Sequence, residues 1–317
     1  MLEPTIERLI GAIIAVQSRS GLHPIALRPM NANMNAQAPL LVASSESRVL
    51  TLRFNNPRRL NGWTLPMKKA LEAALRDAST NDDVAAVVLT GTGEYYSAGV
   101  DLGGAMRPMH PRALHSAIER ANYELFDAFI QFPKPIIAAV NGHAIGAPVT
   151  TATLCDRIIA SEDASFRTPF ARFGLPPEGC SSVLFPRLMG QQTAERLLGE
   201  EGWRPSASEA LSIGLIDEVV APHALVPTAQ AQAKAWVVAG QSRTFKKGAT
   251  QEELVAANRA ESRGVADALL SSKFFMSQFR FMASKKKTGM ALTFLGLWLT
   301  RPAWSKLLAR EQTGEQR

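Results

Sequence analysis

Apolar and polar residues alternate along the chain with two different periods. Where every second residue is apolar, or where several apolar residues follow one another, the pattern predicts a strand buried on one face or on both. These segments are residues 48–54, 85–90, 135–140 and 158–160. Apolar residues three or four positions apart predict helices between them, one beginning after Thr64 and one over residues 112–131. The order of strands and helices favours an α/β fold built around a sheet.

From about residue 252 onward the pattern predicts helices only. Phe275, Phe279 and Met282 are spaced by four and three residues, which places them on one face of a helix. Residues 288–308 are apolar, aromatic and basic, and we expect Pro302 to interrupt them. This segment is too short and too interrupted to span a bilayer. We expect it to pack on its own or on a neighbouring subunit, with contact at a membrane surface as the alternative.

Composition places the chain among globular proteins. Of its 317 residues, 46% are hydrophobic and 20% are charged, which argues against a disordered or collagen-like chain. The two cysteines, Cys155 and Cys180, are too few for a disulfide framework or a cysteine-rich metal site. We therefore expect no metal centre, a reducing compartment, and cysteines that act as small core residues.

The net charge of +7 is concentrated toward the C-terminus. Residues 271–317 hold nine basic and two acidic residues, so the rest of the chain is neutral. A nucleic-acid-binding protein usually carries its basic face on the folded body, and we expect no nucleic-acid partner here. A basic tail suits phosphorylated small ligands, an acidic membrane surface or a neighbouring subunit.

Two glycine-marked turns follow the second and third predicted strands. The first spans residues 93–102 and the second spans residues 141–148, where Pro148 fits the first turn of a following helix. A helix that begins after such a turn presents free N–H groups. Each turn has an ordinary structural interpretation as well. As a pair, they predict that N–H groups from two places converge on one oxygen, which defines an oxyanion hole.

Glu178 lies among apolar and small residues, and no lysine or arginine stands between Arg172 and Arg187. A carboxylate that is desolvated without a nearby cation has a raised proton affinity, which suits a general base or acid. The alternative is that Glu178 is an acid at the N-terminus of a helix predicted over residues 181–188.

Four segments together resemble the crotonase (enoyl-CoA hydratase/isomerase) superfamily, and in particular its peroxisomal-type Δ3,Δ2-enoyl-CoA isomerase branch. They are residues 54–61, 95–102, 139–150 and 168–186. The last of them, TPFARFGLPPEGCSSVLFP, is long and specific to the isomerase branch. The likeness covers roughly residues 40–287.

The resemblance implies a fold and a division of the chain. The expected fold is α/β, a spiral of ββα units followed by a C-terminal helical region that forms trimers. We expect an N-terminal extension over residues 1–39, a crotonase core over residues 40–250, a helical oligomerisation region over residues 251–287 and a basic apolar extension over residues 288–317. The implied assembly is a homotrimer or a dimer of trimers.

The resemblance also implies the site. Val100 and Ala147 would supply the two oxyanion N–H groups, and Glu178 would be the isomerase base. The substrate is an acyl-CoA thioester, so CoA is part of the substrate and no separate cofactor is expected. The residues expected to bind CoA are Ala98, Gly99, Val100, Asp101, Leu102, Arg58 and Lys286. Arg58 and Lys286 would meet its phosphates, although a solvated basic face is the alternative for either.

Departures from the family pattern favour one reaction. The two glutamates that activate water in hydratases of this superfamily fall on Thr150 and Phe170, and neither residue can exchange a proton with water at neutral pH. One base is enough for a proton shuttle. We therefore predict the conversion of 3-enoyl-CoA to trans-2-enoyl-CoA in fatty acid β-oxidation. A hydratase and a catalytically silent acyl-CoA-binding protein remain alternatives.

Two segments bear on location. Residues 8–45 contain arginines and no acidic residue, which is typical of mitochondrial targeting, with a flexible tail as the alternative. Ser305-Lys306-Leu307 resembles a peroxisomal address, but that address is read only at a free C-terminus. We therefore expect a mitochondrial location, with the peroxisome or glycosome as the alternative.

Overall fold

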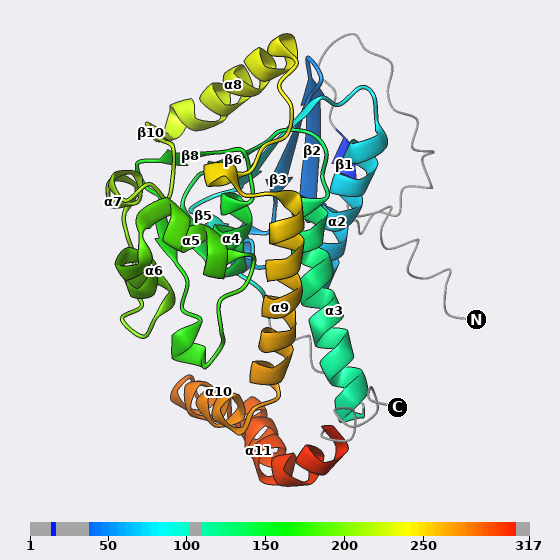
Figure 1. Ribbon diagram of the computed structural model, residues 1–317, viewed down its shortest axis with the longest axis vertical. Coiled ribbons are helices and arrows are strands. Elements are labelled where there is room, and N and C mark those ends of the chain that lie inside the picture. Colours follow the sequence, from blue (N-terminus) through cyan, green and yellow to red (C-terminus); the bar gives the residue numbers. More distant parts are fainter. Residues whose placement is uncertain (1–13, 17–37, 102–109, 309–317) are drawn as a thin grey trace, which may run out of the picture.

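A central sheet of seven strands organises the computed structural model, which describes residues 14–16, 38–101 and 110–308 (Figure 1). In spatial order the strands are β1 (Ile14–Val16), β2 (Leu41–Glu46), β3 (Val49–Phe54), β4 (Ala86–Gly91), β6 (Ile136–Val140), β8 (Arg157–Ser161) and β10 (Glu218–Val220). Neighbouring strands are parallel, except that β2 and β3 form an antiparallel pair. All four predicted strands are present, as β3, β4, β6 and β8.

Both faces of the central strands are covered, which explains their continuous apolar runs. Val88 and Ile137 pack with Ala229 and Ala233 of α8 (Leu225–Ala239), which crosses the top of the molecule in Figure 1. Val87 and its alternate neighbours face the larger core on the opposite side of the sheet. That core is closed by α2 (Leu65–Thr80) and α3 (Pro111–Ile130).

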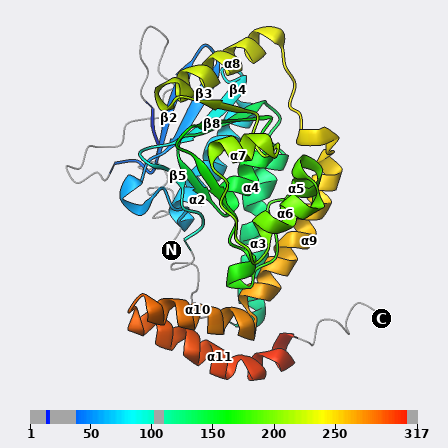
Figure 2. The same ribbon diagram turned by 90° about the vertical axis from the view of Figure 1, so that its left-hand side faces the viewer.

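A second sheet of three short parallel strands carries the chain into the candidate site. These strands are β5 (Tyr95–Ser97), β7 (His143–Ile145) and β9 (Ser165–Arg167). The helices that follow along the chain are α4 (Ala147–Thr153), α5 (Ser181–Met189), α6 (Gln191–Leu198), α7 (Ala207–Ser212) and α9 (Gln251–Leu269). Short 3-10 turns are η1 (Pro57–Arg59), η3 (Ala171–Phe173), η4 (Pro222–Ala224) and η5 (Lys246–Gly248). Helices α3 and α9 lie side by side in both views (Figures 1 and 2).

The C-terminal region is helical, as predicted, and ends in a hairpin of α10 (Ser272–Ser284) and α11 (Thr288–Leu308) below the body (Figure 2). Phe274 and Phe275 of α10 pack against Phe294 of α11 and Leu114 of α3, so the segment packs on its own chain. The predicted interruption at Pro302 is wrong, because α11 continues through it. Trp304 contacts Phe275 with ring centroids 5.8 Å apart, and this packing holds the turn beyond the proline. Among the described helices, none is long and apolar enough to cross a bilayer.

Candidate active site

The two glycine-marked turns meet at one end of the small sheet. Strands β5 and β7 are parallel neighbours, and their chains turn at Gly99 and Gly146, whose φ values of 93° and 71° suit glycine. The two turns touch, because a Cβ on Gly99 would lie 2.6 Å from the carbonyl oxygen of Ile145. Val100 follows the first of these glycines and Ala147 follows the second, so both residues leave turns that are in contact.

Both amides are free to donate. Trp63 N–H donates to Gly99 O at 2.8 Å and Asp101 N–H donates to Trp63 O at 3.1 Å, so the residues on either side of Val100 take up the bonds to Trp63. Ala147 is the first residue of α4, and the first N–H groups of a helix have no partner within it. Among the described residues neither amide has a hydrogen-bond acceptor. Both N–H groups are therefore available to a hydrogen-bond acceptor from outside the described chain.

Glu178 lies beside the same helix end. The next two residues, Gly179 and Cys180, have φ values of 67° and 61° and reverse the chain before α5. A Cβ on Gly179 would lie 2.4 Å from Thr150 Oγ1 and 2.5 Å from Phe126 Cε1, so this peptide is packed between α4 and α3. Thr150 lies one helical turn after Ala147, and Glu178 is therefore held near the N-terminal end of α4.

The Glu178 residue is 9% exposed, and its Oε2 accepts a hydrogen bond of 2.7 Å from Asn122 Nδ2 on α3. Burial raises its pKa from 4.5 to about 7, even though the Asn122 hydrogen bond lowers it. The nearby charge of Glu261 raises the same pKa further, and Lys68 lowers it. A carboxyl group whose pKa lies near the working pH can both remove and return a proton.

The N-terminus of α5 takes its carboxylate from a different residue. Glu261 of α9 accepts hydrogen bonds from Cys180 N–H at 2.6 Å and from Ser182 N–H at 2.9 Å. The Glu178 side chain points instead to Asn122. The alternative interpretation of Glu178 as the acid of this helix end is therefore wrong, because Glu261 fills that role.

Asn122 is itself held by α9. Ser262 Oγ lies 2.9 Å from Asn122 Oδ1 and donates to it, which leaves the Asn122 amide nitrogen directed at Glu178. Asn258 lies one turn earlier on α9 and donates to the carbonyl oxygen of Tyr123 at 3.0 Å. Sequence analysis missed this group. Its sequence signal is a set of polar residues on the helix face that packs against α3.

Thr150 and Phe170, the positions at which the family resemblance places the hydratase glutamates, lie near the start of α4. Thr150 is buried and its hydroxyl donates to Ala147 O at 3.1 Å. Phe170 is buried, and its ring edge lies 3.9 Å from where a Cβ on Gly146 would stand. Both residues therefore contribute volume and apolar surface to the site, and neither contributes a titratable group.

The residues predicted to bind CoA are only partly gathered by the fold. Ala98 N–H donates to Leu60 O at 2.9 Å, which joins the first turn to the segment that carries Arg58. Arg58 is exposed in η1, and Lys286 is exposed in the turn between α10 and α11. Leu102 lies outside the described residues.

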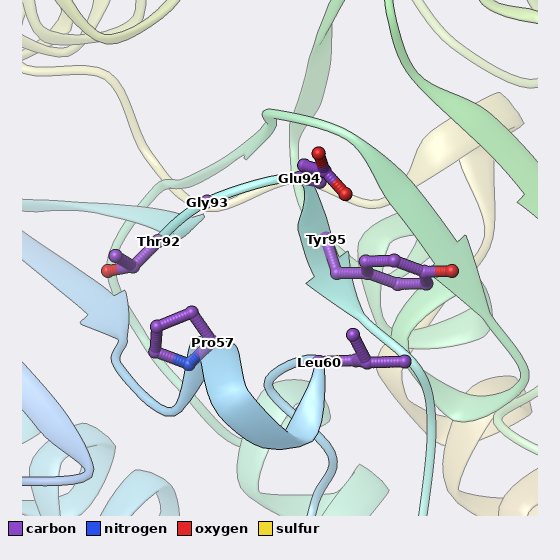
Figure 3. A pocket seen from close by; sticks show the side chains of 6 residues that line it. All are labelled: Pro57, Leu60, Thr92, Gly93, Glu94 and Tyr95. Carbon is purple, nitrogen blue, oxygen red and sulfur yellow. The ribbon is translucent and has the colours of Figure 1, made fainter.

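A cavity of about 220 Å³ lies between η1 and β5 (Figure 3). It is lined by Pro57, Leu60, Thr92, Gly93, Glu94 and Tyr95. None of the residues predicted for catalysis or CoA binding lines it. The candidate site is therefore defined by the two amides and the buried carboxyl group.

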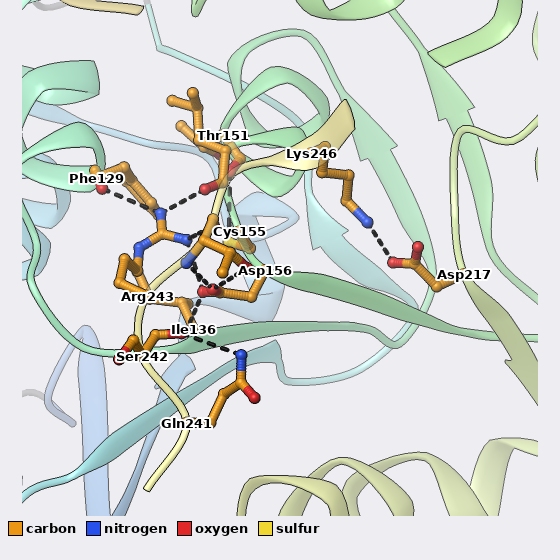
Figure 4. Close-up of polar contacts among 12 residues, drawn as sticks. Phe129, Ile136, Thr151, Cys155, Asp156, Asp217, Gln241, Ser242, Arg243 and Lys246 are labelled. Atoms are coloured by element: carbon orange, nitrogen blue, oxygen red, sulfur yellow. Dashed lines mark hydrogen bonds and ion pairs between the residues drawn. The ribbon is translucent and has the colours of Figure 1, made fainter. Parts of the chain in front are cut away.

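A buried polar network fixes the start of α9 relative to the sheet (Figure 4). Arg243 and Asp156, with side chains 7% and 3% exposed, form an ion pair of 2.6 Å. Asp156 also accepts from the N–H groups of Ile136 at 2.7 Å and Thr244 at 2.6 Å. Nearby, Lys246 pairs with Asp217. These contacts tie the segment before α9 to β6 and β8, and so position the helix that carries Glu261 and Ser262.

Comparison with known proteins identifies the family. A sequence model of the Enoyl-CoA hydratase/isomerase family matches residues 44–280. Enoyl-CoA delta isomerase 2 of Rattus norvegicus is 42% identical over 183 residues, which are 56% of this chain and 46% of that protein. Enoyl-CoA delta isomerase 3, peroxisomal, of Mus musculus is 38% identical over 181 residues, which are 56% of each chain. The chain thus spans about half the length of the curated relatives it matches.

A solved structure agrees with this match. The enoyl-CoA hydratase/isomerase of Pseudoalteromonas atlantica T6c superposes with a TM-score of 0.66 at 30% identity, covering 77% of this chain and 97% of that one. This confirms the predicted crotonase fold and its C-terminal helical region. The chain belongs to the enoyl-CoA hydratase/isomerase family, the crotonase superfamily.

Proposed function

We propose that the chain is a Δ3,Δ2-enoyl-CoA isomerase that moves the double bond of a 3-enoyl-CoA to give trans-2-enoyl-CoA. The observation that carries this proposal is the buried carboxyl group of Glu178, whose following peptide packs against α4, the helix that begins at Ala147. The residues Thr150 and Phe170 at the hydratase positions support isomerisation rather than water addition. Relatives that are named enoyl-CoA delta isomerases support the same choice.

The proposed mechanism needs one base. The thioester oxygen accepts hydrogen bonds from Val100 N–H and Ala147 N–H, and Glu178 removes a proton from C2. The electrons of the broken C–H bond delocalise into a dienolate, whose negative charge on the oxygen the two amides stabilise. Glu178 then gives the same proton to C4, and the double bond moves from C3–C4 to C2–C3. The substrate and product are isomers, and CoA enters and leaves as part of them.

The proposal is tested by a direct assay. Conversion of 3-hexenoyl-CoA is followed through the absorbance of the conjugated product, and crotonyl-CoA is offered separately as a hydratase substrate. We expect the first reaction and no hydration in the second. Hydration of crotonyl-CoA at a comparable rate, or binding of both compounds without turnover of either, would refute the isomerase assignment.

The activity should depend on pH through Glu178. The base form is needed to remove the C2 proton, and the pKa of this group is raised to about 7 by burial. We therefore expect kcat/KM to fall about tenfold for each pH unit below that pKa and to level off above it. A pH–rate profile with 3-hexenoyl-CoA measures this, and a profile that stays flat down to pH values near 4.5 would contradict it.

Asn122 is proposed as a positioning residue for the base. Asn122→Ala removes a hydrogen bond to a charged group, so we expect kcat to fall about tenfold to a hundredfold. Because this bond lowers the pKa of Glu178, its loss should also move the midpoint of the pH–rate profile to higher pH. Gln131→Ala, an amide at the exposed end of the same helix, should change neither quantity. An unshifted midpoint in Asn122→Ala would assign the residue a structural role only.

Location and assembly remain proposals. We propose that the chain acts in mitochondria, and the peroxisome is the alternative that the name of the mouse relative supports. The residues predicted to target it, 8–45, lie largely outside the described part of the chain. We further propose the homotrimer or dimer of trimers that the family resemblance implies.

A further inference from the structure

Helix α11 follows the part of the chain that the family match explains. The family model ends at residue 280, whereas α11 spans Thr288–Leu308. Its inner face is accounted for, since Ala291 is buried and Phe294 packs with Phe274 of α10 and Leu114 of α3. Its outer face has no partner among the described residues.

That outer face is apolar. Leu292 and Leu299 are 60% and 63% exposed, one either side of the half-buried Leu295. Spacings of three and four residues place these leucines in one row along the helix. Trp298 is also exposed, at the border of the row. A row of large apolar side chains in water is unfavourable, which indicates a surface that another phase or molecule covers.

The polar groups on this face need no water. Thr293 Oγ1 donates to Gly289 O at 3.0 Å, and Thr300 Oγ1 donates to Gly296 O at 2.9 Å. Both exposed threonines therefore satisfy their hydroxyl groups within the helix. A hydroxyl group that is satisfied in this way can enter an apolar medium at low cost.

The charges around the hairpin have one sign. No acidic residue occurs between Asp267 and Glu311. The same stretch contains Lys273, Arg280, Lys285, Lys286, Lys287, Arg301, Lys306 and Arg310. Two copies that met through this outer face of α11 would bring like charges together, and the exposed row is small beside the roughly 800 Å² per partner that stable dimers bury. An anionic surface would instead attract it.

We propose that the α10–α11 hairpin docks on an anionic lipid surface, with the leucine row of α11 in the interfacial layer and Lys285 and Lys287 against lipid headgroups. Apolar burial and attraction to anionic lipid act together in such binding. The proposal is independent of the isomerase assignment, because lipid binding is measured without substrate. The hairpin also contacts the surroundings of the candidate site. Phe281 of α10 packs on Phe173 of η3, which lies in the loop that leads to Glu178.

The test is flotation of the full chain with phosphatidylcholine vesicles that contain or lack phosphatidylserine. We expect binding to the anionic vesicles that weakens as salt is raised, and little binding to phosphatidylcholine alone. Leu292→Glu with Leu299→Glu should lower the vesicle partition coefficient more than tenfold. Lys285→Gln with Lys287→Gln should lower it about twenty- to thirtyfold, since each lysine near an anionic surface contributes about fivefold. Val238→Glu, which changes an exposed apolar residue on α8, should leave binding unchanged.

Two outcomes would overturn the proposal. One is equal partition of the leucine variant and the unaltered chain onto anionic vesicles. The other is a change of sedimentation mass in the leucine variant without any loss of vesicle binding, which would assign the row to contact between copies. Unchanged circular dichroism and thermal unfolding of both double variants serve as the check that the hairpin is still folded. Trp298→Phe adds a second readout, because the unaltered chain should show a blue shift of tryptophan fluorescence on vesicles that this variant largely loses.

Discussion

Glu178→Gln is expected to lower kcat for 3-enoyl-CoA isomerisation by about 10³-fold or more, because general acid–base catalysis by one group commonly contributes 10²- to 10⁴-fold and this site uses the same group twice. Gln retains the size of Glu178 and can still accept the hydrogen bond from Asn122. Acyl-CoA binding should therefore be almost unchanged. Steady-state kinetics with 3-hexenoyl-CoA, together with calorimetric titration of a product thioester, separate the two effects.

The same variant should be more stable than the unaltered chain above pH 7. Since burial raises the pKa of Glu178 from 4.5 to about 7, the folded state holds its proton where the unfolded state has released it. Stability from this group is complete below pH 4.5 and is lost as pH rises through about 7, a loss of about 3 kcal/mol. Gln avoids that loss. Glu124→Gln, at an exposed position on α3, is the matched control.

For the kinetic prediction, turnover near the unaltered rate in Glu178→Gln would remove this base from the mechanism.

Asp156→Ala is expected to lower the free energy of unfolding by about 3–5 kcal/mol. The substitution leaves the Arg243 guanidinium buried without its counter-charge and removes the acceptor of the Ile136 and Thr244 N–H groups. A loss of this size is a large part of the about 5–15 kcal/mol that stabilises a typical domain. Urea unfolding followed by circular dichroism measures it.

The control for this prediction is a surface ion pair. Arg196 and Glu201 lie 3.0 Å apart with side chains 46% and 51% exposed, so Glu201→Ala should cost less than about 1 kcal/mol. Asp156→Ala combined with Arg243→Ala should cost less than the two single losses added together, because the uncompensated charge is gone. A loss below about 1 kcal/mol in Asp156→Ala would show that the network contributes little.

Four strands of the central sheet, β3, β4, β6 and β8, were predicted, whereas β1, β2 and β10 were not. The inner strands were predictable because both of their faces are covered. Val88 faces α8 and Val87 faces the main core, so both kinds of position are apolar and the strands appear as unbroken runs. Strands β5, β7 and β9 have three residues each, too few for a period to show. The glycines next to β5 and β7 predicted the two turns, although the strands themselves were not predicted. Pro302 misled the prediction because tertiary packing of Trp304 outweighed a local preference.

The candidate site, too, was predicted only in part from the sequence. Val100, Ala147 and Glu178 were each predicted from a short stretch of sequence. Glycines mark the turns before Val100 and Ala147, and the lack of lysine and arginine near Glu178 indicated a raised proton affinity. Asn122 reaches Glu178 across 56 positions of the chain, and Glu261 reaches Cys180 across 81. Such contacts depend on how α3, α5 and α9 pack together. A single sequence contains no measure of that packing.

Helix α9 holds two parts of the site with adjacent residues. Glu261 anchors the peptide that follows Glu178, and Ser262 orients the asparagine that contacts it. A rotation or slide of α9 would therefore alter both the direction in which the carboxyl group points and the ease with which it gives up its proton. Any event that displaces this helix could tune the rate from a distance, without a single atom of the reacting thioester being touched.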